Sequence, residues 1–341
     1  MEPRSVVAVD LGGTNVRARA YLAGGEPAGA RVDRPSHAQS GLEAVLEALA
    51  SAIQSATEVA EVPPRAVGLA VPGHIDDAAG LVRWAPNFGE TVDGVFRYWE
   101  DVPLKRALEE RCGLPVRMDN DANLAALGEY LYGGGKGHAR CLVMFTIGTG
   151  IGGGVILGPG ATTGRSGGPL MLVGGNKGGA ELGHLMVMQG GLDCNSGEYG
   201  SLEAYCQKDA IVRRAVHRLR RGRKSLLREL AGGDWARVTP AMISQAAEQG
   251  DELALEVWAE IGTALGAGIG SAINVFAPDI VAIGGQIAKA WEFILGPARR
   301  AARDCAIPTL FRDCNILQAE LLDDAGMLGA SALAHGELDG A

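Results

Sequence analysis

The sequence lacks a surplus of positive charge. Its 341 residues carry 31 Lys and Arg against 40 Asp and Glu, which gives a net charge of −9. Proteins that bind nucleic acid or an anionic membrane through surface charge need basic patches. We therefore expect neither nucleic acid nor a membrane as a partner.

Cysteine pairs and export signals are missing as well. The six cysteines are scattered without a pairing pattern, as is usual for reduced thiols of the cytoplasm. The N-terminal segment carries charges at positions 2 and 4, unlike a signal peptide. These features predict a cytoplasmic protein.

Two long uncharged segments have to be considered as membrane spans. Residues 141–164 are uncharged but contain many glycines and a proline. In residues 261–278, Gly262, Gly266 and Gly270 recur every four positions, and polar residues dilute the run. This spacing predicts a buried helix with close backbone packing, with a membrane span as the alternative.

Two common nucleotide-binding motifs are absent. The chain contains no G-x-x-x-x-G-K-[ST] sequence. Residues 148–153 fit G-x-G-x-x-G, but that motif requires a following helix and an acidic residue about 20 positions later. Here a strand pattern follows and the next acidic residue is Glu181. The sequence therefore predicts neither a P-loop nor a Rossmann site.

Glycine, by contrast, is abundant. The chain has 51 glycines among 341 residues, about twice the usual share. They follow no period of three and no low-complexity pattern, which excludes collagen-like and disordered chains. A globular protein of this composition uses its backbone at working surfaces.

Strand and helix patterns alternate along the chain. Strands are expected at 6–10, 16–22, 67–71, 116–118, 142–145, 155–157, 280–283 and 316–319. Helices are expected at 42–53, 104–111, 202–220, 240–248, 253–273 and 327–335. The alternation predicts an α/β fold with mostly parallel sheets covered on both faces.

The chain also begins its pattern twice. Residues 8–14 resemble residues 144–150, a weak internal repeat at the start of each presumed domain. We expect a small N-terminal domain at 1–120 and a larger C-terminal domain at 121–321. A C-terminal helix at about 322–341 would pack back on the first domain.

Each copy of the repeat contains a glycine turn between two strands. Consecutive backbone N–H groups in such a turn can bind an anion, and Thr14 and Thr149 can add hydroxyl donors. Two such turns across a cleft suit a polyphosphate, although each alone can be an ordinary hairpin. Asp10 precedes the first turn and could hold Mg²⁺ through water or cap the turn.

Residues 120–123 (Asn-Asp-Ala-Asn) follow a strand and open a helix. Open α/β sheets bind ligands at this end of their strands. Asp121 could accept the proton of an attacking hydroxyl in phosphoryl transfer. The helix N-terminus would keep its carboxylate ionised. The alternative is that Asp121 is a helix N-cap.

Together with residues 179–184 (Gly-Ala-Glu-Leu-Gly-His) and 283–285 (Ile-Gly-Gly), these motifs stand in the order of the ROK family. The chain resembles the bacterial glucokinases of that family over residues 6–335. The resemblance implies an actin-like ATPase (ribonuclease-H-like) fold, with two α/β domains around a hinged cleft. It also implies ATP and Mg²⁺ as cofactors and phosphorylation of the 6-hydroxyl of glucose.

The resemblance assigns roles to individual residues. It makes Asp121 the catalytic base and Asp10 the residue that holds Mg²⁺ through water. The expected sugar-binding residues are Asn87, Asn120, Glu181, His184 and Glu203. The expected nucleotide-binding residues are Asp10, Gly12, Gly13, Thr14, Asn15, Arg17, Thr146, Gly148, Thr149, Gly150, Gly284 and Gly285.

One loop departs from the family pattern. The usual zinc loop reads C-x-C-G-x-x-G-C, with the motif histidine as the fourth ligand. Here Ser196 and Ser201 replace two of the three thiolates, and a serine hydroxyl is a poor zinc ligand. We predict no zinc, so that protein hydrogen bonds orient His184. A site rebuilt with Cys194 and Cys206 is the alternative.

Several choices stay open in the sequence. The acceptor could be another hexose or N-acyl hexosamine, such as fructose, mannose or N-acetylmannosamine, and polyphosphate could replace ATP as donor. The basic residues 218–224 would then meet the polyanion. A ROK-type sugar-responsive regulator and an actin-like scaffold ATPase are further alternatives. The family resemblance implies a homo-oligomer, a dimer or a tetramer.

Overall fold

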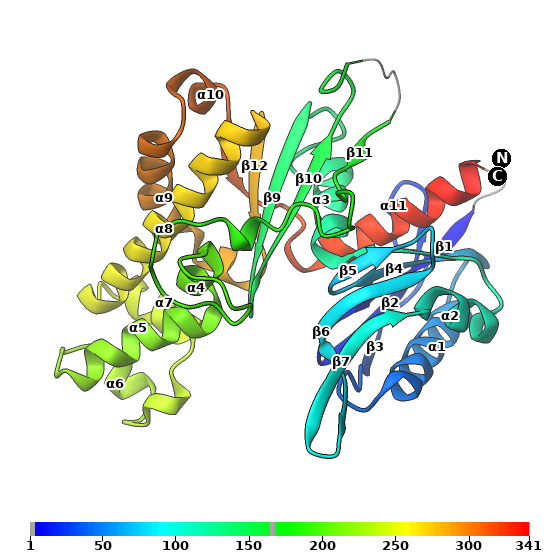
Figure 1. The fold of residues 1–341 in the computed structure, drawn as a ribbon, viewed down its shortest axis with the longest axis horizontal. Helices are drawn as coiled ribbons and strands as arrows, with labels where there is room; N and C mark the ends of the chain where they lie inside the picture. The colour runs from blue at the N-terminus through cyan, green and yellow to red at the C-terminus, as the bar shows by residue number, and fades with distance from the viewer. Residues whose placement is uncertain (1–3, 164–167, 341) are drawn as a thin grey trace.

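Two five-stranded sheets form the framework of the structure, a computed structural model that describes residues 4–163 and 168–340 (Figure 1). The first sheet has the order β3-β2-β1-β4-β8 and the second has the order β11-β10-β9-β12-β13. In each sheet, antiparallel strands lead into a run of three parallel strands. The short internal repeat of the sequence therefore extends to the topology of a whole sheet.

The elements have the following bounds. The first sheet contains β1 (Ser5–Leu11), β2 (Asn15–Leu22), β3 (Val32–Pro35), β4 (Pro64–Val71) and β8 (Val116–Asn120). The second contains β9 (Cys141–Ile147), β10 (Ile151–Leu157), β11 (Leu170–Met171), β12 (Ile280–Gly284) and β13 (Asn315–Gln318). A third sheet contains β5 (His74–Asp76), β6 (Leu81–Val92) and β7 (Val95–Val102).

The α-helices surround these sheets. They are α1 (Leu42–Glu58), α2 (Leu104–Cys112), α3 (Asp121–Tyr132), α4 (Leu202–Cys206), α5 (Lys208–Arg220), α6 (Leu227–Leu230), α7 (Pro240–Glu248), α8 (Glu252–Phe276), α9 (Trp291–Cys305), α10 (Pro308–Arg312) and α11 (Ala325–Gly340). Short 3₁₀ helices are η1 (Leu182–His184), η2 (Trp235–Arg237), η3 (Gln286–Ala290) and η4 (Leu322–Asp324).

Three expectations need correction. The sheets are mixed rather than mostly parallel, because each begins with antiparallel strands. The single helix expected at 202–220 is divided into α4 and α5 by Gln207, whose backbone is extended. The third sheet and α9 were not predicted at all. Residues 1–3 and 341, at the ends of the expected domains, lie outside the described residues, and the domain boundary near residue 120 stays a prediction.

Local sequence signals account for several helices. Thr239 caps α7 by accepting a hydrogen bond from Met242 N at 3.2 Å, and Pro240 occupies the first turn, as predicted. Helix α2 ends at Gly113, whose φ of 68° lies in the left-handed region that favours glycine. In α1, apolar side chains at helical spacing are buried against the first sheet.

Helix α8 is long and apolar enough to be considered for a membrane span, but 61% of its most apolar window is buried inside the structure. Its regularly spaced glycines face the backbone of α9. A Cβ at Gly262 would lie 2.6 Å from Ile294 O, and one at Gly266 would lie 2.3 Å from Ala298 O. The predicted close backbone packing of this helix is therefore confirmed.

Two helices, α3 and α11, join the sheets (Figure 1). Helix α3 covers the second sheet, where Ala126 lies over Gly154 of β10, and α11 covers the first sheet, where Ala330 lies over Gly68 of β4. The helices touch each other through backbone, because a Cβ at Gly329 would lie only 1.7 Å from Leu124 O. Bulkier residues at these glycines would force the layers apart.

We predict that Gly329→Ala lowers the free energy of unfolding by about 3 kcal/mol or more, because the added methyl group has no room. Gly336→Ala, in the same helix, is the matched control. A Cβ there meets no atom within 4 Å, so alanine should be neutral or stabilise by up to about 1 kcal/mol through helix propensity. Urea denaturation measures both, and equal effects of the two changes would contradict the packing argument.

Candidate active site

The start of α3 places two polar side chains at the end of β8. Asn120 is the N-cap: its Oδ1 accepts hydrogen bonds from Ala122 N at 2.9 Å and Asn123 N at 3.1 Å. Its Nδ2 donates to Gly73 O at 2.9 Å, which joins this helix start to the loop after β4. The N-cap interpretation of Asp121 is therefore wrong, because Asn120 performs that role and Asp121 is the first residue of the helix.

The Asp121 carboxyl is shifted toward its protonated form. Burial raises its pKa from 3.8 to about 6, and the charges of Asp10 and Glu181 add to the effect. The hydrogen bond from Ala122 N, 2.8 Å long, opposes it. We expected the helix N-terminus to dominate, but desolvation and like charges outweigh it. At pH 7 the group is still mostly ionised.

The first glycine turn links β1 to β2. Gly12 N donates to Asn15 O at 2.8 Å, while Gly13, Thr14 and Asn15 are exposed. Asp10, at the end of β1, has its pKa raised by burial, partly offset by Arg17. Arg17 lies 3.8 Å from Asp10 and 3.8 Å from Asp33, so its guanidinium faces carboxylates of the protein itself.

The second glycine turn links β9 to β10. A strand rather than a helix therefore follows the turn, as expected, and this excludes a Rossmann motif. Gly148 N donates to Gly150 O at 2.9 Å, and Thr149 is exposed. Glu203, at the start of α4, accepts from Ile151 N at 2.7 Å. This carboxylate, expected to bind sugar, thus has one oxygen on the turn backbone. Thr146 is half-buried next to Gly152.

The glycine pair after β12 lies beside the second turn. Gly285 has a φ of 79°, and a Cβ on it would lie 2.6 Å from Ile147 N. Gly284 faces the side chain of Met144, where a Cβ would meet Cε at 2.5 Å. Glycine is therefore required at position 285 by its positive φ and by the close approach of the Ile147 backbone, whereas at Gly284 the flexible Met144 side chain could give way.

Glu181 lies just before η1, and His184 is the last residue of η1. Glu181 Oε2 is 3.9 Å from His184 Nε2, while its Oε1 is 3.2 Å from Nε2 of His74. His74 begins β5, in the third sheet, so this contact joins the two halves of the chain. Asn87, on exposed β6, is not joined by a hydrogen bond to any other candidate in the described part of the chain.

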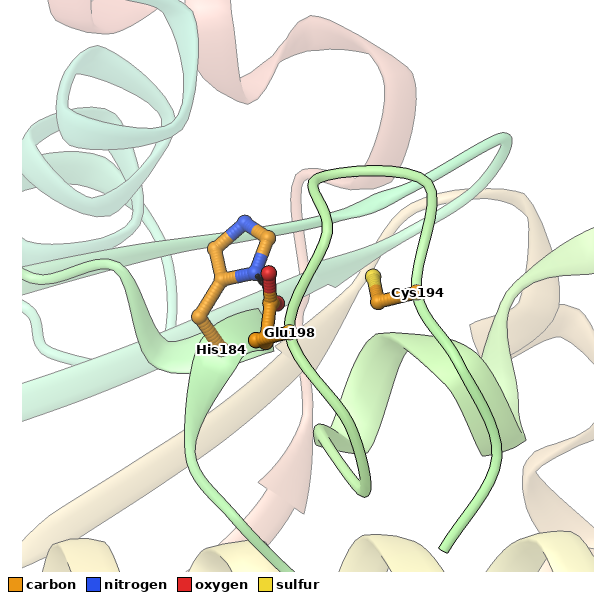
Figure 2. Close-up of side chains that lie close together, drawn as sticks. All are labelled: His184, Cys194 and Glu198. Carbon is orange, nitrogen blue, oxygen red and sulfur yellow. Dashed lines mark hydrogen bonds and ion pairs between the residues drawn. The ribbon is translucent and has the colours of Figure 1, made fainter.

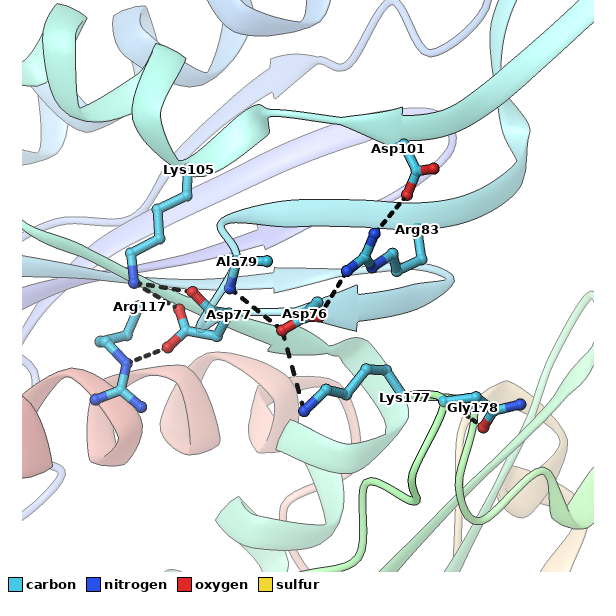
Figure 3. Close-up of polar contacts among 10 residues, drawn as sticks. Asp76, Asp77, Ala79, Arg83, Asp101, Lys105, Arg117, Lys177 and Gly178 are labelled. Carbon is cyan, nitrogen blue, oxygen red and sulfur yellow. Dashed lines mark hydrogen bonds and ion pairs between the residues drawn. The ribbon is translucent and has the colours of Figure 1, made fainter.

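A second contact accompanies that of His74. Lys177 reaches across from the loop before η1 to Asp76 of β5, with Nζ 4.0 Å from Oδ1 (Figure 3). Asp76 also accepts from Arg83 at 3.0 Å. Sequence reasoning missed both His74 and Lys177. The available signal was the position of His74 directly after Pro72 and Gly73, at the end of a buried strand.

The altered loop after η1 brings three potential metal donors together: His184 Nδ1, Cys194 Sγ and a Glu198 oxygen all lie within 4.8 Å of one another (Figure 2). Each of the three, however, already has a hydrogen-bond partner within the protein. His184 Nδ1 contacts the Glu198 carboxylate directly, and Ser196 Oγ lies 3.2 Å from Cys194 Sγ. Burial alone would raise the pKa of Glu198, but hydrogen bonds from Ser196 and His184 hold it at about 2.

These residues do not fit the zinc site of the family pattern. One thiolate remains of three, and ligands of a tetrahedral zinc ion stand about 3.3 Å apart, farther than a hydrogen-bonded ring and carboxylate. Ser201 is buried and faces no partner among the described residues. Cys206 points at Ile261 O, 3.6 Å away, and burial raises its pKa to about 12. The alternative of a site rebuilt with Cys206 is therefore wrong.

Comparison with known proteins adds the family. The ROK family model matches residues 6–337. The glucokinase of Thermotoga maritima is 35% identical over 340 residues, 100% of each chain. The xylose repressor of Caldicellulosiruptor bescii is 27% identical over 294 residues, which are 85% of this chain and 68% of the repressor.

A solved structure supplies the fold. A ROK family glucokinase from Streptomyces griseus, in complex with glucose and AMPPNP, superposes with a TM-score of 0.80 at 31% identity, and covers 97% of this chain and 99% of that one. The two-sheet architecture is thus the actin-like ATPase fold expected from the sequence. The chain belongs to the ROK family.

Proposed function

We propose that this protein is an ATP-dependent sugar kinase that transfers the γ-phosphoryl group of ATP to the 6-hydroxyl of glucose in the cytoplasm. The observation that carries the proposal is the half-buried Asp121 carboxyl at the start of α3, whose pKa is raised by desolvation and by the charges of Asp10 and Glu181. Full-length similarity to a glucokinase supports the choice of glucose.

Asp121 serves as the base in this proposal. In phosphoryl transfer the transition state is loose, so the base mainly orients the hydroxyl and accepts its proton. A base works best when its pKa lies near the working pH, because it is then both ionised and a competent proton acceptor. The pKa of about 6 for Asp121 meets this requirement.

The glycine turns and Asp10 form the phosphate side. The exposed turn residues, which are Gly13, Thr14 and Asn15 in the first turn and Thr149 in the second, would offer backbone N–H groups to phosphate oxygens. Asp10 would hold Mg²⁺ through water, and that ion would neutralise charge on the phosphates. A cation would also offset the repulsion between the half-buried carboxylates of Asp10 and Asp121, since the charge of Asp10 raises the pKa of Asp121.

The sugar side consists of Asn120, Glu181, His184 and Glu203. Carboxylates and amides can bind neighbouring hydroxyl groups in pairs, and an unmatched buried partner is costly. Asn87 is exposed on β6, in the third sheet, and belongs to the set only by the family resemblance. The complex of the Streptomyces griseus relative with glucose and AMPPNP supports a sugar and a nucleotide in one site.

A sugar-responsive regulator is the second candidate, favoured by the similarity to a xylose repressor. The chain covers 68% of that relative, and the binding of DNA by the purified protein together with no sugar turnover would support it. A coupled assay across hexoses, with ATP or polyphosphate as donor, separates these functions.

We predict that Asp121→Asn lowers kcat for glucose by about 10²–10⁴-fold, the usual contribution of a general base, while the nucleotide still binds. Asp234→Asn is the matched control. Asp234 is an exposed cap of η2, whose side chain accepts from Ala236 N at 3.0 Å, and asparagine caps equally well. Steady-state turnover and calorimetric titration with AMPPNP measure both, and turnover retained in Asp121→Asn would refute the assignment.

We further predict that kcat/KM for glucose falls about tenfold per pH unit below a pH of about 6 and is level above it, because Asp121 must lose its proton before it can accept another. Glu181→Gln removes a neighbouring negative charge and should move the inflection to lower pH. Protonation of ATP would not respond to this change. An inflection that stays fixed in the variant would assign the pH dependence to another group.

A further inference from the structure

The loop of residues 194–201 is closed by its own backbone. Cys194 N donates to Glu198 O at 2.8 Å, and Gly197 N donates to Cys194 O at 3.0 Å. Gly197 has a φ of 97°, which allows the tight turn between them. Asp193 pairs with Tyr199 across the same turn. The loop thus has an ordered closure made by hydrogen bonds alone.

This turn directs the Glu198 side chain toward His184. The carboxylate contacts Nδ1 of the ring (Figure 2), and the Ser196 hydroxyl lies 3.4 Å from the same atom. The opposite ring nitrogen, Nε2, lies on the side of Glu181, 3.9 Å from its Oε2. His184 is therefore held by one edge, and its other edge faces the candidate sugar residues.

We propose that Glu198 is a positioning residue for His184, which holds the imidazole by Nδ1 where the family pattern places zinc. The effect on sugar binding rests on the proposed function, whereas the contact between Glu198 and His184 does not. A group bound at one ring nitrogen fixes the orientation and the protonation of the other nitrogen, whether that group is a metal or a carboxylate. A carboxylate accepts from Nδ1–H and leaves Nε2 free to accept a hydrogen bond from a sugar hydroxyl.

The surrounding loop residues serve the same arrangement. Ser196, where the family pattern has a thiolate, donates from Oγ to Cys194 Sγ at 3.2 Å and helps to lower the pKa of Glu198. Cys194 Sγ in turn lies 3.6 Å from Glu203 Oε1. A continuous set of contacts therefore connects Glu198 to the Glu203 carboxylate, which itself binds the second glycine turn through Ile151 N.

The first test reads the ring directly and needs no turnover. Long-range ¹H–¹⁵N spectra of the full chain, with the His184 signals assigned through His184→Gln, report which ring nitrogen carries the proton. We expect the Nδ1–H form in the wild type and its loss in Glu198→Ala. An Nε2–H form in the wild type, or a form that Glu198→Ala leaves unchanged, overturns the proposal even if the protein phosphorylates no sugar.

The second test measures metal and substrate binding in the same preparations. We expect substoichiometric zinc by mass spectrometry, with turnover at excess Mg²⁺ unaffected by a zinc-selective chelator. Glu198→Ala should raise the KM for glucose about tenfold while the KM for ATP changes little, and Glu198→Gln, which keeps an acceptor oxygen, should recover part of the loss. Glu248→Ala, at an exposed site on α7, is the control. One zinc per chain with chelator-sensitive turnover, or an unchanged glucose KM in Glu198→Ala, contradicts the proposal.

Discussion

The structure depends on one constraint, the backbone contact between α3 and α11. Gly329 lies against Leu124 O, and Gly128 lies against Ala325 O, where a Cβ would come within 2.2 Å. Below and above this pair, Gly154 and Gly68 let each helix approach its sheet just as closely. At Gly329, Gly128 and Gly68 a Cβ would meet backbone atoms of the next layer, so any side chain there would push the layers apart. Asp121 is the first residue of α3, so the same packing also fixes the position of the candidate base relative to the sheets.

Glu129 of α3 binds both segments of the chain that connect the two sheets. Its buried carboxylate accepts hydrogen bonds from Gly134 N at 2.8 Å, Glu320 N at 2.8 Å and Leu321 N at 3.1 Å. Gly134 lies on the passage from α3 to β9, and residues 320–321 lie on the return from β13 to α11. One carboxylate therefore holds the two connections between the sheets together. Glu129 lies near the end of α3, the helix that carries Asp121 at its start, so the same helix bears both the candidate base and this junction.

The sequence predicts what local pattern controls. The paired hairpins, the capped helix α7 and the order of the motifs were all predicted because each depends on a few neighbouring residues. The third sheet was missed since β6 contains Pro86 and Gly89 and pairs irregularly with β7, so its strand pattern is weak. Helix α9 contains Pro297, which hides its helical pattern. The raised pKa of Asp121 comes from burial and from charges 111 and 60 positions away in the chain, which no local reading contains.

The glycine excess has two physical causes that composition alone cannot separate. At Gly329 and Gly68 a side chain has no space, so glycine is a packing requirement. At Gly13 and Gly148 a Cβ would meet nothing within 4 Å, so space does not explain glycine there. What these turns have in common is an exposed tip at the end of a strand pair, formed by Gly13, Thr14 and Asn15 in one copy and by Thr149 in the other. A ligand that approaches the backbone itself would explain them, and a chain of phosphates is such a ligand. The same residue type thus brings the two sheets together and leaves their facing edges open.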